Sequence, residues 1–483
     1  MLITLAAPAF AGTWYIENGD ITVKAGETKG TNKVSQGENP EVEDTNTVIT
    51  NSDKDKASSN TVTIEAKDKD DKVEVTLKDV NIDTSSRSEA AVSVTGEGNT
   101  NIELDGDNAL KSDIYSSGIS SSGSLTISGG ENDSLTAQGG SGADGIYSSG
   151  SLTISGGTVT ANGGSGGGGD GGDGIWSSGG VTISGGSTVT ANGGDGKDDY
   201  GGDGIRSDSG DVTISGGTVK AAGGDSKDGY GGDGIRSGGV TISGGTVNAA
   251  GGNGGKVGGY GICSFARVAI SGGTVNAAGG NGKNSNGGSD GIISNDIDLS
   301  GSLELTAKAG RPNGKAISWA GHELDLDTIK DKLGPGAKVT ATDANGETKQ
   351  VSSPIPRPVE PEEPEPVIPE ESSSSSDGGS ATPSAPASPL PGLTVTDKDG
   401  QRISYTSTQS GNTLTVCVGR LTASLHVSLA ALRQLRAEGI DTITFQTILC
   451  STTLSVDELL AMGGEDAEAV LTHRFTDSSL TVG

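Results

Sequence analysis

Residues 173–194 read DGIWSSGGVTISGGSTVTANGG, and residues 203–224 repeat the phrase as DGIRSDSGDVTISGGTVKAAGG. Six related openings begin at Asp144, Asp173, Asp203, Asp233, Tyr260 and Asp290. They are separated by 29, 30, 30, 27 and 30 residues. A fixed period of this length is typical of solenoids, in which each repeat packs only against its neighbours.

Within each repeat, apolar residues alternate with polar ones. Val212 and Ile214 would face one side of a strand and Thr213 the other, and glycine pairs mark the corners. No proline lies between Pro40 and Pro312, as expected for strands that are paired on both edges. The pattern predicts an all-β fold, a right-handed parallel β-helix with coils of about 30 residues. In one coil, the residues expected to point inward are Ile146, Leu152, Ile154, Val159 and Ala161.

The composition divides the chain into four parts. Residues 1–11, MLITLAAPAFA, are typical of the end of an export signal, although a buried first strand is the alternative. Residues 12–350 are expected to form the β-helix, with regular repeats over 117–310, irregular cap coils on either side and a short helix near the C-terminal cap. Residues 351–391, rich in Pro, Glu and Ser, predict a disordered linker. Residues 392–483 predict a small α+β domain.

The last part contains two related halves. Each half is expected to run from a strand into a short helix and on to a second strand, with Ser428 and Ser455 opening the helices. Cys417 and Cys450 lie on expected strands of this part, and whether they form a disulfide stays open. Cys263 stands alone among the repeats.

The charge excludes several classes of partner. The chain has 33 basic and 63 acidic residues and a net charge of −30. Such a chain cannot neutralise phosphates, which argues against binding nucleic acid or an anionic membrane surface. No apolar run approaches 18 residues, so no membrane-spanning segment is expected. We expect a monomer.

The run LKDVNIDTSSRSEAAVSVTGEGNTNIELDGDNALKS, followed by repeated SGGTVTANGG, resembles the glycine-rich parallel β-helix surface proteins of Firmicutes. These are described as adhesin-like or carbohydrate-binding-domain-containing proteins. The resemblance covers roughly residues 60–310. It implies a secreted or cell-surface location and glycan binding, and it transfers no site residue. At the corner, where relatives carry GAGIGGG, this chain has Asp173-Gly174-Ile175-Trp176.

An active site is hard to assemble from this sequence. His322, His426 and His473 have no catalytic motif around them. Enzymes with this fold use carboxylates with calcium, or a carboxylate pair, on irregular coils, whereas these coils are nearly copies of one another. We therefore expect that the chain is not an enzyme. The alternative is a calcium-dependent polysaccharide lyase.

The first candidate site is a column of aspartates. If the coils keep register, the carboxylates stack about 4.8 Å apart and repel one another. Calcium would relieve this repulsion. The alternative is that each aspartate caps its own turn through a backbone N–H. The column consists of Asp144, Asp173, Asp203 and Asp233.

The second candidate lies one residue beyond each inward isoleucine. The outward positions of consecutive coils hold Tyr147, Trp176, Arg206 and Arg236, which we call the aromatic–arginine strip. Aromatic faces suit the C–H surfaces of sugars, and guanidinium groups bind uronates or sulfates. The alternative is a solvated face on which an arginine stacks on Trp176. Tyr200 and Tyr230, in corner loops, are candidates to extend this surface.

Outward Thr and Ser ladders are a third possibility, since flat hydroxyl arrays can order water, although they also satisfy one another. The ladders comprise Thr153/Ser155, Thr182/Ser184, Thr213/Ser215 and Thr241/Ser243.

The function we expect is that of a non-catalytic, adhesin-like surface protein whose partner is a polysaccharide or cell-wall glycan. A purely structural spacer of the cell envelope is the alternative.

Overall fold

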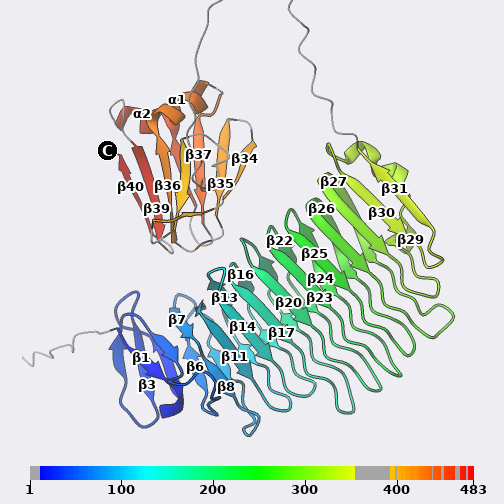
Figure 1. Cartoon of the computed structure of the whole chain (residues 1–483), viewed down its shortest axis with the longest axis horizontal. Helices are drawn as coiled ribbons and strands as arrows, with labels where there is room; N and C mark the ends of the chain where they lie inside the picture. Colours follow the sequence, from blue (N-terminus) through cyan, green and yellow to red (C-terminus); the bar gives the residue numbers. More distant parts are fainter. Residues whose placement is uncertain are drawn as a thin grey trace, which may run out of the picture. The chain divides into compact units, whose positions relative to one another are not determined.

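The computed structural model divides the chain into two compact units, Met1–Pro354 and Ile355–Gly483 (Figure 1). It describes residues 11–353 of the first unit. In the second it describes residues 392–482 except 398–399, 404, 411, 419, 421, 438, 448–450, 463–467 and 475–476. Most of the predicted export signal and of the predicted linker lies outside the described residues.

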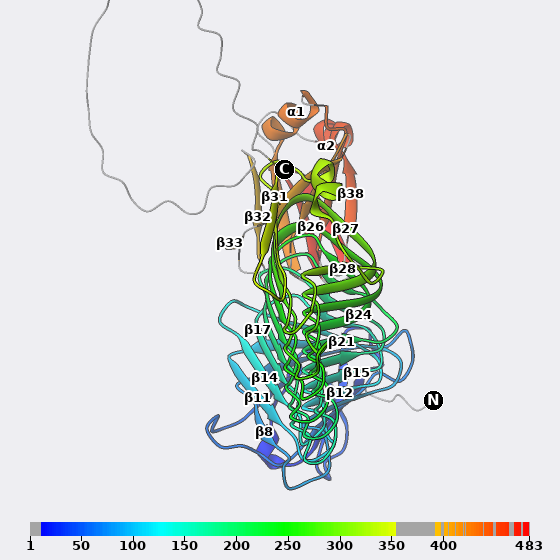
Figure 2. The same ribbon diagram turned by 90° about the vertical axis from the view of Figure 1, so that its right-hand side faces the viewer.

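The first unit is a parallel β-helix, as the repeats predict, and its coils place their strands in three columns. Figure 2 labels strands of the first and the third column on either side of the coils. The first column includes β6 (Val62–Glu65), β9 (Val92–Thr95), β12 (Ile119–Ser121), β15 (Ile146–Ser148), β18 (Ile175–Ser177) and β21 (Ile205–Ser207). The second includes β7 (Lys72–Lys78), β10 (Asn99–Asp105), β13 (Ser124–Gly129), β16 (Leu152–Ile154), β19 (Val181–Ile183) and β22 (Val212–Ile214). The third includes β8 (Asn81–Asp83), β11 (Asp107–Lys111), β14 (Ser134–Gln138), β17 (Thr158–Asn162), β20 (Thr188–Asn192), β23 (Thr218–Ala222) and β25 (Thr246–Ala250).

Later coils have longer continuous strands. β24 (Ile235–Ile242) joins the first two columns, while β26 (Ile262–Ala278) and β27 (Ile292–Lys308) run through all three. The pairing between successive coils is parallel and stacks like on like, so that Val159 pairs with Val189 and Ala161 with Ala191. All five predicted inward residues of the β15–β17 coil are fully buried. The narrow core therefore consists of stacked small apolar side chains, which explains the low hydrophobic fraction.

Antiparallel strands close both ends of the solenoid. The N-terminal end contains β1 (Thr13–Tyr15), η1 (Ile16–Asn18), β2 (Ile21–Ala25), β3 (Asn32–Gln36), β4 (Val42–Asp44) and β5 (Val48–Thr50), with β2, β3 and β4 antiparallel. The C-terminal end contains β28 (Ile317–Trp319), β29 (His322–Glu323), η2 (Leu326–Lys332), β30 (Lys338–Thr342) and β31 (Thr348–Ser352), with antiparallel β30–β31. The helix predicted near this cap is the 3-10 helix η2. Such ends keep the open edges of the coils from pairing with other chains.

The second unit packs two sheets around one core, which confirms the α+β prediction. One sheet contains β33 (Arg402–Ile403), β32 (Leu393–Thr396), β36 (Thr422–Ser428), β39 (Glu468–Arg474) and β40 (Asp477–Val482). The other contains β34 (Thr406–Ser410), β35 (Thr413–Cys417), β37 (Thr442–Gln446) and β38 (Ser451–Ser455). Helix α1 (Leu429–Ala437) joins β36 to β37, and α2 (Val456–Met462) joins β38 to β39. No helix among the described residues is long and apolar enough to cross a membrane.

The two halves expected from the sequence are related in the structure. β36 and β39 pair antiparallel in one sheet, while β37 and β38 pair antiparallel in the other. Each helix therefore carries the chain from one sheet to the opposite one. The backbone N–H of Ala431 donates to Ser428 Oγ at 3.2 Å, and that of Glu458 to Ser455 Oγ at 3.4 Å, as expected for the serines that open the helices.

Candidate functional site

The first strand column holds the candidate residues in register. Ile146 pairs with Ile175, and Ile175 with Ile205. The glycine before each isoleucine allows the close approach of the coils. A Cβ atom on Gly174 would lie 2.6 Å from the backbone nitrogen of Asn192 and 2.7 Å from the carbonyl oxygen of Gly204. The glycines of the openings thus superpose on successive coils, as predicted.

The aspartates form a buried ladder between coils. Asp173 and Asp233 are 8% and 5% exposed. Each Oδ1 accepts the backbone N–H of the equivalent residue in the following coil, because the coil spacing brings that N–H within reach. The distances are 2.7 Å from Asp173 N to Asp144, 2.6 Å from Asp203 N to Asp173, 2.6 Å from Asp233 N to Asp203 and 2.7 Å from Tyr260 N to Asp233. The expectation that each aspartate caps its own turn is wrong, since the bond joins two coils.

Burial raises the pKa of every carboxyl in the ladder. It raises the pKa of Asp144 to about 6. Burial, followed by repulsion from Asp203, raises the pKa of Asp233 to about 8. For Asp173, burial and the neighbouring carboxylates on both sides raise the pKa well above its usual value of 3.8. A protonated carboxyl still accepts the N–H through its carbonyl oxygen, so the ladder can carry less than its full formal charge at neutral pH.

The structure brings the two predicted sets of residues together. Trp176 pairs with Arg206, and Arg206 with Arg236, so the aromatic–arginine strip is continuous. An Nη1 atom of Arg206 lies 4.0 Å from Asp173 Oδ2, and that of Arg236 lies 3.8 Å from Asp233 Oδ2. The arginines therefore supply positive charge where the repulsion argument assigned a calcium ion. In the parts of both units that the structure describes, no group of three or more His, Cys, Asp or Glu side chains could hold a metal ion.

The aromatic members of the strip face each other rather than the solvent. The ring centroids of Tyr147 and Trp176 are 4.5 Å apart, with an angle of 8° between the planes. These residues are stacked along the coil axis, so a face of each ring covers a face of the other. A ligand approaching from outside meets ring edges and guanidinium groups. The two ring faces in this stack are therefore not open to a sugar, contrary to the expectation that aromatic faces bind it.

A second stacked pair forms in the corner loops. The rings of Tyr200 and Tyr230 have centroids 5.0 Å apart, and the Nζ atom of Lys256 lies 5.5 Å from the centroid of Tyr230. Tyr200 is 54% exposed. The two tyrosines thus repeat the pattern of the strip in another part of the coil.

Two further features of the site were not predicted from the sequence. Phe265 is 56% exposed, and the guanidinium carbon of Arg236 lies 5.2 Å from its ring centroid, which extends the strip by one aromatic residue. In addition, a buried serine lies two residues after the inward isoleucine of each repeat opening. Ser177 Oγ lies 2.9 Å from the carbonyl oxygens of both Gly150 and Gly180, which belong to neighbouring coils. The repeated phrase Ile-x-Ser was the available signal for this second ladder.

The Beta helix repeat family model matches residues 152–175, 181–205, 212–235 and 240–262. The matched segments include Asp173, Asp203 and Asp233. The second, third and fourth candidate positions of the strip each follow directly after a matched segment. No curated protein and no solved structure matches the chain. The likeness therefore concerns the scaffold, a parallel β-helix.

Proposed function

We propose, from the premise of a parallel β-helix built on these repeats, that this chain is an exported, adhesin-like surface protein that binds acidic polysaccharide without catalysing a reaction. The observation that supports the proposal is the continuous outward strip of Tyr147, Trp176, Arg206 and Arg236. Two guanidinium groups on adjacent coils stand about 4.8 Å apart along the backbone, a spacing that suits successive acidic groups on one polymer.

The two arginines differ in how free they are. Arg206 Nε donates to Asp208 Oδ1 at 2.8 Å, which fixes this guanidinium group at the surface. The guanidinium group of Arg236 lies over the ring of Phe265, and its Nη1 atom lies 3.8 Å from Asp233 Oδ2. Most of its N–H groups therefore form no short hydrogen bond. A uronate carboxylate would form paired hydrogen bonds with Arg236 more readily. Because a shallow face buries little of one sugar chain, tight binding requires many contacts along a polymer.

The test is binding of polygalacturonate to the full chain and to the Arg206→Gln/Arg236→Gln variant. We expect binding that weakens about tenfold in the variant, which corresponds to about 1.4 kcal/mol, and that weakens with salt. Lys220→Gln is the matched control because it removes one exposed positive charge from β23, in another column of strands. Equal affinity of the double variant and the wild type would contradict the proposal, and release of unsaturated uronates would contradict its non-catalytic part.

A structural spacer is the second candidate function. It is favoured by the fact that the strip satisfies itself, with Tyr147 stacked on Trp176 and Arg206 bonded to Asp208. A glycan array, read with and without calcium, separates the two functions. Binding to no glycan on the array would favour the spacer.

Calcium binding by Asp144, Asp173, Asp203 and Asp233 stays a prediction of the sequence that the geometry does not favour. Each Oδ1 already accepts a backbone N–H, and no group of three such side chains among the described residues could hold a metal ion. Calcium at 100 times its dissociation constant would stabilise the solenoid by about 2.7 kcal/mol. An unchanged melting temperature at millimolar calcium would leave the aspartates with their role of joining coils.

A further inference from the structure

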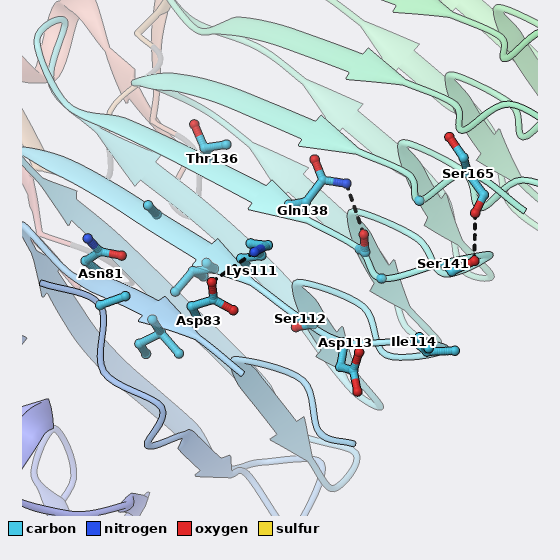
Figure 3. A pocket seen from close by; sticks show the side chains of 17 residues that line it. Asn81, Asp83, Lys111, Ser112, Asp113, Ile114, Thr136, Gln138, Ser141 and Ser165 are labelled. Carbon is cyan, nitrogen blue, oxygen red and sulfur yellow. Dashed lines mark hydrogen bonds and ion pairs between the residues drawn. The ribbon is translucent and has the colours of Figure 1, made fainter. Parts of the chain in front are cut away.

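A groove with a volume of about 760 Å³ lies on the third strand column, away from the strand column that carries the strip. Figure 3 shows its floor, formed by outward side chains of β8, β11 and β14, and its wall, formed by the corner loops that follow β11, β14 and β17. The groove crosses four successive coils, which gives it a length of about 14 Å. Its volume falls in the range of about 300–1,000 Å³ typical of small-ligand clefts.

The floor of the groove is polar, and the positive charge of Lys111 in it is neutralised by an ion pair. Lys111 Nζ lies 2.9 Å from Asp83 Oδ2, so these two charges compensate each other. Gln138 Nε2 donates to the carbonyl oxygen of Gly139 at 3.0 Å. Its Oε1 has no hydrogen-bond partner among the described residues, and Thr136 presents an exposed hydroxyl group. The floor therefore offers hydrogen-bond acceptors and donors without a free positive charge.

The wall adds a carboxylate and an apolar rim. Asp113 is half-buried, and within the described part of the chain its carboxylate has no partner. Ile114 and Tyr115 follow and are 53% and 85% exposed. Tyr115 has a φ of 63°, in the left-handed region that costs a non-glycine residue energy. The lining of the groove ends at Ile114 in this loop, and the backbone of the next residue holds the large aromatic side chain of Tyr115 in solvent just outside that lining.

The later coils do not repeat this arrangement. The backbone N–H of Tyr115 donates to the carbonyl oxygen of Ser141, in the corner of the next coil. There the corner carries Ser141 and Gly142 in place of bulky side chains, and a Cβ atom on Gly142 would lie 4.0 Å from Tyr115 Cε1. The small neighbouring corner leaves a face of the tyrosine ring uncovered, unlike the stacked rings of the strip.

We propose that this groove binds a neutral polysaccharide segment of about three sugar units. Sugar hydroxyl groups would donate to Asp113 and Gln138, while Ile114 and Tyr115 would contact the C–H surfaces of the sugar rings. An acidic ligand is disfavoured because Asp113 is uncompensated, Lys111 is already paired, and the chain has a net charge of −30. The groove therefore differs from the strip in both place and ligand charge.

The test is calorimetric titration of the full chain with neutral hexasaccharides of the β-1,4-glucan, mannan and xylan types. Tyr115→Asn removes the ring, and asparagine tolerates the left-handed backbone, so the loop is kept. We expect at least one hexasaccharide to bind and its affinity to fall about three- to tenfold in this variant. Asp113→Asn, which keeps the size of the side chain, should also weaken binding. Tyr200→Asn is the matched control, since it removes an exposed tyrosine outside the groove.

Several outcomes would overturn this assignment. They are binding of no neutral hexasaccharide by the wild type at millimolar concentration, equal affinity of Tyr115→Asn and wild type, and binding of trigalacturonate that depends on Asp113. The Arg206→Gln/Arg236→Gln variant should bind the neutral ligand like the wild type. The two proposals can therefore fail independently. The proposed function depends on the affinity of the arginine variant for polygalacturonate, and the groove depends on the affinity of the Tyr115 and Asp113 variants for the neutral hexasaccharides.

Discussion

The solenoid and the C-terminal two-sheet unit bury polar side chains in opposite ways. In the solenoid, a polar residue is stacked on its own kind, as Asp173 is on Asp203 and Ser177 on Ser207. In the C-terminal unit, His473 is fully buried among different partners. Its Nδ1 lies 3.2 Å from Thr447 Oγ1 and its Nε2 3.0 Å from Thr452 Oγ1, and its ring packs against Phe445.

The difference shows what repetition does to a buried ionisable group. A repeat copies a favourable hydrogen bond into every coil, and it also copies the charge, so like carboxylates face each other along the ladder. A non-repeating fold can surround one imidazole with neutral hydroxyl groups. In both regions burial favours the neutral form, which raises the pKa of Asp203 and lowers the pKa of His473. The two units should therefore respond to pH in opposite directions.

The largest expected effect tests whether the two units are independent. Phe445 is fully buried in the core of the C-terminal unit. Phe445→Ala should destabilise this unit by about 3–5 kcal/mol, because it removes a large apolar side chain and leaves a cavity. Calorimetry of the full chain should show a lower transition for this unit and an unchanged one for the solenoid. A shift of both transitions would show that the units unfold together.

The next effect tests the close packing of the coils. Gly174→Ala should destabilise the solenoid by about 3 kcal/mol, because the added Cβ atom would meet backbone atoms that cannot move aside independently. Gly168→Ala is the matched control, since a Cβ atom there meets nothing within 4 Å. Urea unfolding of both variants measures the difference. Equal midpoints would mean that the coils lie farther apart than this register requires.

The third effect concerns the aspartate ladder. Because the pKa of Asp233 is raised from 3.8 to about 8, the folded solenoid binds more protons than the unfolded chain within that range. Its stability should therefore be greatest at acidic pH and decrease as the pH rises towards 8. Asp203→Asn keeps an acceptor for the next coil and removes one charge, so it should stabilise the solenoid by about 1–2 kcal/mol at pH 8.

Melting curves between pH 5 and pH 8 measure this effect. Asp195→Asn is the control, because Asp195 is exposed and also accepts a backbone N–H from the following coil, that of Asp225 at 2.9 Å. It should change the melting temperature little. A solenoid that becomes more stable from pH 5 to pH 8 would contradict the role assigned to the ladder.

The smallest effect should have the opposite sign. The pKa of His473 is lowered from 6.5 by burial, so below that pH the unfolded chain binds more protons than the folded unit. The C-terminal unit should lose up to about 1 kcal/mol as the pH falls through this region. His473→Gln, which does not titrate, should abolish the loss, whereas His426→Gln, at a partly exposed site beside Glu468, should preserve it. An acid response unchanged in His473→Gln would assign it to other groups.

Much of the scaffold follows from the sequence because its signals are local and repeated. Alternation identifies the inward residues, such as Ile154 and Val159, and the constant spacing fixes which residues of successive coils pair. The same spacing places the aspartates and the strip in columns. Ser428 and Ser455 mark the helices of the C-terminal unit through their own backbone contacts.

The sequence by itself thus determined the β-helix, its register and the columns, because periodicity and glycine corners depend on neighbouring residues. Only the tertiary structure decided what the columns do. Three contacts of the columns depend on the directions that side chains take between coils. They are the hydrogen bond that each Asp Oδ1 accepts from the next coil, the face-to-face stacking of Tyr147 on Trp176 and the 4.0 Å distance from Arg206 to Asp173. The groove beside Asp113 likewise needs three strands and three loops from different coils, and no single segment of sequence contains that shape.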